Sequence, residues 1–141
     1  SGLFRLLMKV GLAIYNRLAN DSDVSGLVDT RIYPNVAPQR TAIFPFLVYT
    51  ITSVTPNDTK EGVSTLDVND VLIMCYSNTY NEAADLANKV RTSMDRIPEG
   101  TYNTIKIQSS QFEGYNDSFS ANAGDEGIYV KSLDFNIRQI I

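Results

Sequence analysis

The segment from Thr65 to Ile97 constrains the fold most, because it joins an unbroken apolar run directly to a helix. Residues 71–76 read Val-Leu-Ile-Met-Cys-Tyr, and successive apolar residues put apolar side chains on both faces of a strand. Both faces of that strand therefore need cover. The pattern predicts a strand over 65–77 in the middle of a sheet, followed at Asn78 by a sharp turn.

The helix that follows is marked at both ends. Thr79 and Glu82 form a capping-box pattern at its start, and Pro98 stands where it must stop. Steps of three and four residues separate the apolar positions between them, which predicts one apolar face on the helix. These positions are Ala83, Ala87, Val90, Met94 and Ile97.

Two helices are predicted before this segment and one strand leads into it. The spacing of Val10, Ile14 and Leu18 predicts a first helix ending near Asn20, and a short second helix is predicted over 24–28. β-Branched and aromatic residues predict a strand over 46–54. The turn-rich connector 56–62 makes this strand and 65–77 an antiparallel hairpin.

Two more strands are predicted after the long helix. One spans 102–112, with Ile105 and Ile107 on one face, and the other spans 128–140. The second alternates cleanly, with Leu133, Phe135 and Ile137 inward. Between them, residues 114–127 are rich in Gly, Asn, Ser and Asp, which predicts a flexible loop.

The order of elements, α-α-β-β-α-β-β, predicts an α+β fold. We expect a mostly antiparallel four-stranded sheet with the helices packed on one face. Such a sheet usually leaves its other face to water, but residues 46–49 and 71–76 are apolar on both faces. We therefore expect the second face to be covered by the 35–44 loop, by residues 114–127 or by another subunit.

The length of 141 residues fits one domain. Ser1-Gly2 resembles the remnant of tag cleavage, and Met8 is a plausible natural start. We therefore expect residues 1–7 to be an expression-vector remnant and 8–141 to form the domain. A secretory signal is the alternative for the first residues, but their apolar part is short and no small-residue cleavage site follows.

The composition argues against most catalytic chemistry. The chain has no histidine, which removes the commonest general base and zinc ligand, and its one cysteine, Cys75, lies in the apolar run. The net charge of −4 and the lack of a Lys/Arg run argue against a nucleic-acid patch. No stretch is typical of a membrane span. The sequence predicts no catalytic residue, cofactor or metal, so we expect no enzyme.

Three groups of acidic residues could contradict this expectation by binding a metal or acting in catalysis. Residues 21–26 resemble the start of a calcium loop, but Ile32 replaces the closing glutamate, so a polar turn capping a short helix is the better interpretation. Asp67 and Asp70 fall on opposite faces of a strand and do not converge. Asp125 and Glu126 lie in the predicted loop, where solvated charge is the simpler interpretation.

Several short stretches resemble the tail-completion family of long-tailed bacteriophages, which are tail-terminator or head–tail joining proteins. The clearest are Arg-Ile-Tyr-Pro at 31–34, the loop with Pro38, and Phe-Pro-Phe-Leu-Val-Tyr at 44–49. The likeness spans about 8–140 and excludes residues 1–7. The other matching stretches are the 14–18 helix, the Ala-rich middle helix, Tyr115-Asn116 and the closing 133–137.

The resemblance implies a structural virion protein that forms a homo-oligomeric ring, commonly a hexamer. Such a ring caps the head-proximal end of the tail tube, ends tail polymerisation and joins the tail to the head connector. Its implied partners are itself, the tail tube protein, and a head connector or stopper protein. DNA would pass through without specific binding, which the lack of a basic stripe suits. The implied location is the virion tail, after assembly in the host cytoplasm.

The polar connectors are our candidate assembly interface. We expect residues 56–64 and 114–127 to be mobile in the free subunit and to become ordered on assembly, because they bury little apolar surface. The candidate interface residues are Asn57, Asp58, Lys60, Glu61, Tyr115, Asp117, Phe119, Asp125 and Glu126.

Two other classes of function remain open. One is a small-ligand-binding module, which a closed apolar cavity in the monomer would favour. The other is a histidine-free hydrolase, which two acidic residues converging in a cleft would favour.

Overall fold

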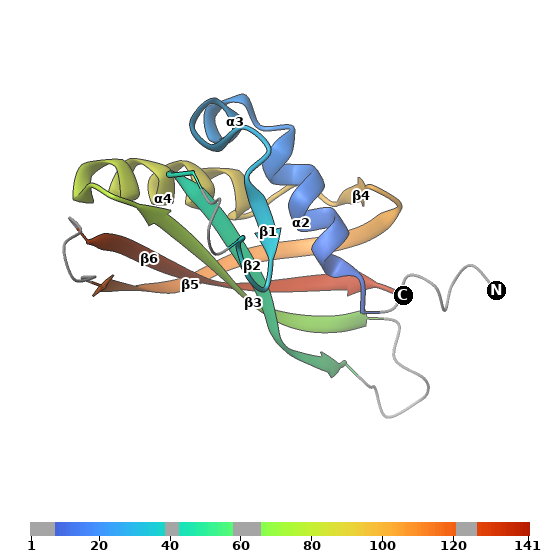
Figure 1. Cartoon of the computed structure of the whole chain (residues 1–141). Helices are drawn as coiled ribbons and strands as arrows, with labels where there is room; N and C mark the ends of the chain where they lie inside the picture. The colour runs from blue at the N-terminus through green and yellow to red at the C-terminus, as the bar shows by residue number, and fades with distance from the viewer. Residues whose placement is uncertain (1–7, 39–42, 58–65, 121–126) are drawn as a thin grey trace.

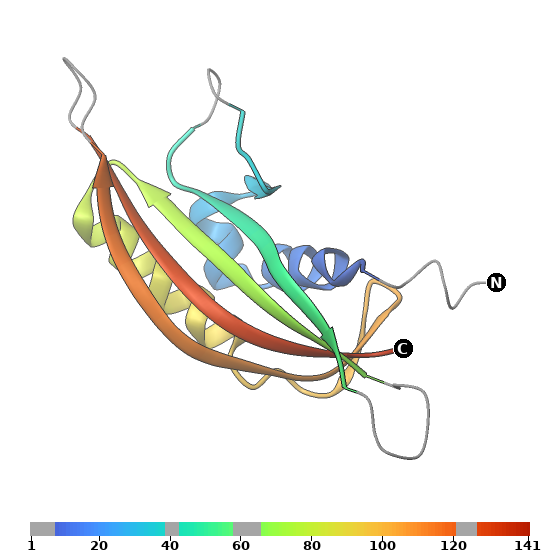
Figure 2. The ribbon, with the colours of Figure 1, turned by 90° about the horizontal axis from the view of Figure 1, so that it is seen from below.

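The computed structural model describes residues 8–38, 43–57, 66–120 and 127–141. In this part of the chain a curled six-stranded sheet carries three helices on one face (Figure 1). Figure 2 views the molecule from below, so that the strands lie in front of the helices. The elements are α2 (Val10–Ala19), α3 (Ser22–Val28), β1 (Ile32–Pro34), β2 (Phe46–Pro56), β3 (Leu66–Ser77), α4 (Tyr80–Met94), β4 (Gly100–Tyr102), β5 (Ile105–Ser120) and β6 (Ile128–Ile140).

The prediction of a four-stranded, mostly antiparallel sheet is wrong. The strand order is β1-β2-β3-β6-β5-β4, and β1 pairs with β2 in parallel, so the sheet is mixed. The two strands missed are β1 and β4, three residues each, and so short a strand shows no alternation of apolar and polar residues. β1 is instead fixed by backbone bonds to β2, from Leu47 N–H to the Arg31 carbonyl and from Asn35 N–H to the Tyr49 carbonyl, both 2.9 Å.

The prediction of a flexible loop over 114–127 is also wrong in its first half. Residues 114–120 continue β5 and pair with 128–134 of β6. The polar composition of 114–120 gave the wrong prediction because the hydrogen bonds between two strands join backbone N–H and C=O groups. Any residue except proline supplies both groups. A long apolar neighbour, β6, provides the matching ladder.

The other elements agree with the sequence. β2 and β3 form the predicted antiparallel hairpin, and Leu133, Phe135 and Ile137 of β6 point into the core. In β3, every second residue from Val71 to Cys75 is fully buried beneath the helices. Burial of a Val, Leu, Ile or Phe side chain contributes about 1.5–3 kcal/mol, so this layer holds α4 and α2 to the sheet.

The start of α4 keeps half of the predicted capping box. The Thr79 hydroxyl accepts a hydrogen bond from Glu82 N–H at 3.3 Å, as expected. The Glu82 carboxylate does not return to the Thr79 backbone but accepts from the Ser77 hydroxyl at 2.7 Å. Ser77 in turn accepts from Thr79 N–H at 3.3 Å. Ser77 is buried at the end of β3, so the cap fastens the helix to its own strand.

Among the described residues, aromatic rings cover the helix-free face of the sheet at one end. Phe46 is 5% exposed although it lies outside the main core, because Tyr76 stacks on it at 4.7 Å between ring centroids. Phe44, from the predicted covering loop, lies 5.3 Å from Phe46, and Tyr33 lies 6.0 Å from it. Leu72, further along β3, remains half-exposed on this face.

Candidate assembly surface

The free end of the β5–β6 hairpin collects three of the predicted interface residues. Tyr115, Asp117 and Phe119 alternate along β5 and face the helix side of the sheet, opposite Leu133, Lys131 and Tyr129 of β6. Tyr115 is 59% exposed and Phe119 is 54% exposed.

A β-bulge between Phe112 and Gly114 aims these side chains. Phe112 faces the helices, so without an extra residue Asn116 and Ser118 would continue its face. The bulge shifts the alternation by one residue and brings the aromatic residues round instead. Sequence periodicity could not reveal this, because a bulge depends on the partner strand.

Lys131 is the centre of this surface. Its ammonium lies 2.7 Å from the Asp117 carboxylate, 4.7 Å from the centre of the Tyr80 ring and 5.4 Å from that of Tyr115. The Lys131 side chain is 8% exposed. Burial by itself would lower the pKa of Lys131, but the hydrogen bond and charge of Asp117 outweigh it, and the pKa is raised. Lys131 is therefore charged at neutral pH.

Two rings, those of Tyr80 and Tyr115, lie over the ammonium, and Tyr129 and Phe119 extend the contacts from Tyr80. The Phe119 ring lies 4.9 Å from Tyr129, and Tyr80 lies 6.0 Å from Tyr129 edge to face. We call Tyr80, Tyr115, Phe119 and Tyr129 the aromatic cluster. The predicted interface did not include Tyr80, Tyr129 and Lys131, because they come from the start of α4 and from β6 and meet β5 only in the folded chain.

A groove of about 220 Å³ adjoins the cluster, between α4 and strands β5 and β6. The Arg91 guanidinium lies 4.1 Å above the Phe112 ring at its side. Ligand sites usually measure about 300–1,000 Å³, so the groove does not favour the ligand-module alternative. Its lining residues are Ala84, Ala87, Asn88, Arg91, Phe112, Tyr115, Lys131 and Leu133.

The remaining predicted interface residues do not join this surface. Asn57 follows β2, at the end where Leu66 begins β3, and its N–H donates to the Leu66 carbonyl at 3.0 Å. Phe119 and Tyr129 lie at the other end of β3, beside Ser77, so the two regions lie at opposite ends of the sheet (Figures 1 and 2). Asp58, Lys60, Glu61, Asp125 and Glu126 lie outside the described residues.

The acidic groups weighed for chemistry do not converge. Asp67 is buried on the helix side of β3, whereas Asp70 is exposed on the other face and accepts from Ser53 and Asn136. Asp21 caps α3 by accepting from Asp23 N–H at 2.9 Å, which confirms the predicted helix cap. Burial raises the pKa of the Cys75 thiol, so it stays protonated.

Among the residues that the structure describes, no cluster of three or more cysteine, aspartate or glutamate side chains is arranged to hold a metal ion. None of the helices placed there is both long and apolar enough to cross a membrane.

Comparison with known proteins gives one family and one fold. The model of the family described as "Tail completion protein gp17" matches residues 12–138. No curated protein matches the chain. Among solved structures, a chain of the "Virion of native gene transfer agent (GTA) particle" matches with a TM-score of 0.69 and 18% identity. The match covers 91% of this chain and 92% of that one, and at this identity it shows a shared fold.

Proposed function

The chain belongs to the tail completion protein family, as a structural protein of a phage-type virion tail, and from that premise we propose that it caps the tail. In this role it binds the head-proximal end of the tail tube, ends tail polymerisation and joins the tail to the head connector. Its working form is a homo-oligomeric ring of six subunits. The family match over residues 12–138 is the observation that carries the proposal.

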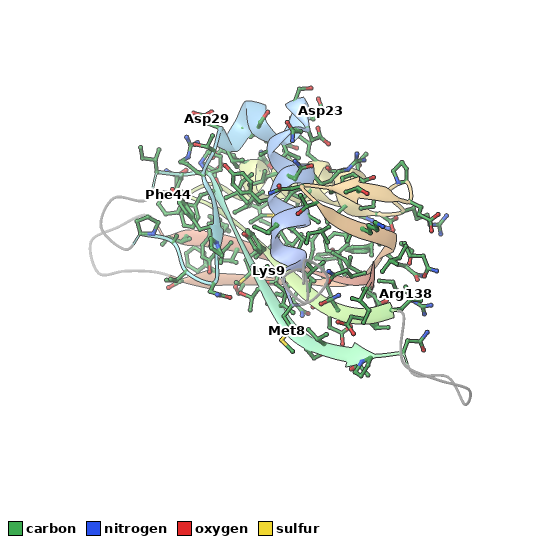
Figure 3. The ribbon with its side chains drawn as sticks, turned by 90° about the vertical axis from the view of Figure 1, so that its right-hand side faces the viewer. Met8, Lys9, Asp23, Asp29, Phe44 and Arg138 are labelled. Carbon is green, nitrogen blue, oxygen red and sulfur yellow. The ribbon has the colours of Figure 1, made fainter. Side chains whose placement is uncertain are left out.

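A ring needs two different patches on each subunit, because one patch must meet the other on the next copy. The first patch is a stripe on the outer side of α2: Met8 is 79% exposed, Leu12 41% and Tyr15 36%. Leu12 and Tyr15 are three residues apart and lie on one face of the helix, and Met8 precedes its first turn. Figure 3 shows Met8 and Lys9 at the start of α2, away from the end where α3 carries Asp23.

The second patch is the part of the helix-free sheet face beyond the stacked rings of Phe46 and Tyr76. Leu72 and Met74 of β3 are half-buried there, beside Thr50 of β2. This patch lies on the side of the sheet opposite the helices, so it cannot meet the α2 stripe within one subunit (Figure 1). We propose that the α2 stripe of one copy covers this face of the next.

The proposed role needs no catalytic turnover. It also suits the acidic chain, which has a net charge of −4, because a ring around DNA works best without phosphate-binding cations in rows. Assembly takes place in the host cytoplasm.

The test is to remove the gene from the virus that encodes the chain. We expect full heads and separate tails that do not join, with tails of uncontrolled length, as seen by electron microscopy. Restoring the gene from a plasmid is the control. Normal numbers of infectious particles in the absence of the protein would refute the proposal.

A mixing experiment tests the ring itself. Leu12→Lys disables the α2 stripe and Leu72→Lys disables the sheet patch, where the new ammonium faces Asp134 on β6 and should be tolerated. Each variant alone should fail to form rings in native mass spectrometry. A mixture should form pairs and no larger species, because each variant keeps the patch that the other lacks. Rings from either variant alone would contradict the proposed interface.

A further inference from the structure

The two sides of the sheet differ in how far their edges are protected from pairing with another chain. On the β2 side, β1 pairs with Leu47–Tyr49, and a bulge interrupts the strand between Ile51 and Ser53. The strand then ends at Pro56, which has no N–H to donate. A covering strand, a bulge and a proline are the usual devices that keep an edge from pairing with another chain.

The β5 edge is closed only along its first half. β4 pairs with 105–107, and the segment after α4 closes the next part. There Arg96 N–H donates to the Ser110 carbonyl at 2.6 Å, and Phe112 N–H donates to the Asp95 carboxylate at 2.9 Å. Beyond Phe112, no described residue pairs with the outer side of β5.

The contacts of Ser110 and Phe112 also show which backbone groups point outward. Backbone groups in an antiparallel strand alternate between its two neighbours, and the bulge after Phe112 shifts the alternation by one residue. The N–H and C=O groups of Tyr115, Asp117 and Phe119 therefore point away from β6. All residues from 115 to 120 are exposed. This is an open edge long enough to receive another strand.

The side chains beside this edge define what an incoming strand should carry. Tyr115 and Phe119 offer exposed rings on the helix side, and alternate side chains of an added strand would lie against them. Arg91 stands over Phe112, where the edge opens, and forms no ion pair with a described carboxylate. An apolar strand with an acidic residue opposite Arg91 matches this surface in shape and charge.

We propose that residues 113–120 of β5 receive an extended segment of another virion protein, which adds to the sheet as a seventh strand. The segment has apolar residues at alternate positions and a carboxylate near Arg91. This inference rests on the proposed tail-completion function and assigns one of its contacts. A second copy of this chain is a poorer occupant. Pairing of this β5 edge with the same edge of another copy closes as a two-fold dimer and cannot build a ring.

The test compares two variants at one position in cells that lack the natural gene. Asp117→Pro removes an outward N–H without touching the ladder to β6, and its ring also blocks a neighbouring strand. Asp117→Ala is the matched control, because both variants lose the carboxylate that pairs with Lys131. We expect the proline variant to give a titre at least about tenfold below that of the alanine variant, since several strand bonds are lost. Equal titres would overturn the proposal.

Hydrogen exchange on the unaltered protein tests whether the β5 edge is paired in the particle, even if the proline variant does not fold. The amides of Tyr115, Asp117 and Phe119 should exchange fast in the free subunit and slowly in intact particles. Fast exchange in both states would overturn the proposal, as would protection of these amides in a free two-fold dimer. Gene deletion tests the proposed function separately: if deletion blocks joining while these amides stay unprotected, the tail role stands and the edge contact is wrong.

Discussion

Lys131 and Asp117 make a sharp test of how the aromatic cluster is held together. Removing the carboxylate by Asp117→Ala leaves a charged ammonium with an 8% exposed side chain. Breaking a fully buried pair costs about 3–5 kcal/mol. Here Asp117 is 47% exposed, so water already screens the pair, and the Tyr80 ring stays as a partial partner. We therefore expect a loss of about 1–2 kcal/mol in the free energy of unfolding.

Lys131→Met should behave differently, although it breaks the same ion pair. The methionine keeps an apolar stem among the rings, and the Asp117 carboxylate that remains is free to turn to water. We expect a change within about 1 kcal/mol, of either sign. Adding Asp117→Ala to Lys131→Met should then leave the free energy of unfolding almost unchanged, because no buried charge remains that could lose its partner.

Urea unfolding of the four proteins, followed by tyrosine fluorescence and circular dichroism, completes the cycle. The difference between the costs of Asp117→Ala in the two backgrounds gives the coupling energy. Equal costs in both backgrounds would refute the view that Asp117 serves mainly to satisfy a buried ammonium. So would a larger loss from Lys131→Met than from Asp117→Ala.

Three further predictions follow from the same structure. The folded-state pKa of Lys131 is raised above 10.5, so the stability that its charge contributes is complete below that pH and is lost above it. Above pH 10.5, the free energy of unfolding of the natural chain should therefore fall more steeply than that of Lys131→Met. Urea titrations at a series of pH values measure both. Thr79→Ala should cost about 1 kcal/mol in thermal or urea unfolding, against almost nothing for the exposed Thr101→Ala. Gly127→Ala should lower the melting temperature and change the near-ultraviolet tyrosine signal, because its Cβ would stand 2.4 Å from the Phe119 ring and the backbone φ is +93°; unchanged spectra and melting would contradict the packing of Phe119.

The long helix and its strand could be predicted from the sequence because their signals are local. Thr79 marks the start of α4, and the apolar run at 71–76 marks β3, without reference to any other segment. The end was predicted at Pro98, but the helix already ends at Met94. β6 shows an equally clear alternation, since one of its faces is buried from Lys131 to Gln139. The packing of the helices on one face of the sheet follows from these patterns. The family resemblance rests on other short stretches, chiefly 31–34 and 44–49.

Only the tertiary structure decided the sheet's width and the candidate surface. The strands β1 and β4 exist because longer neighbours offer them backbone partners, and a bulge opposite β6 decides which β5 side chains face the helices. The aromatic cluster joins residues from α4, β5 and β6 around one ammonium. Periodicity reports what one strand buries; pairing, register and convergence depend on two or more segments at once, and no single stretch of sequence carries them.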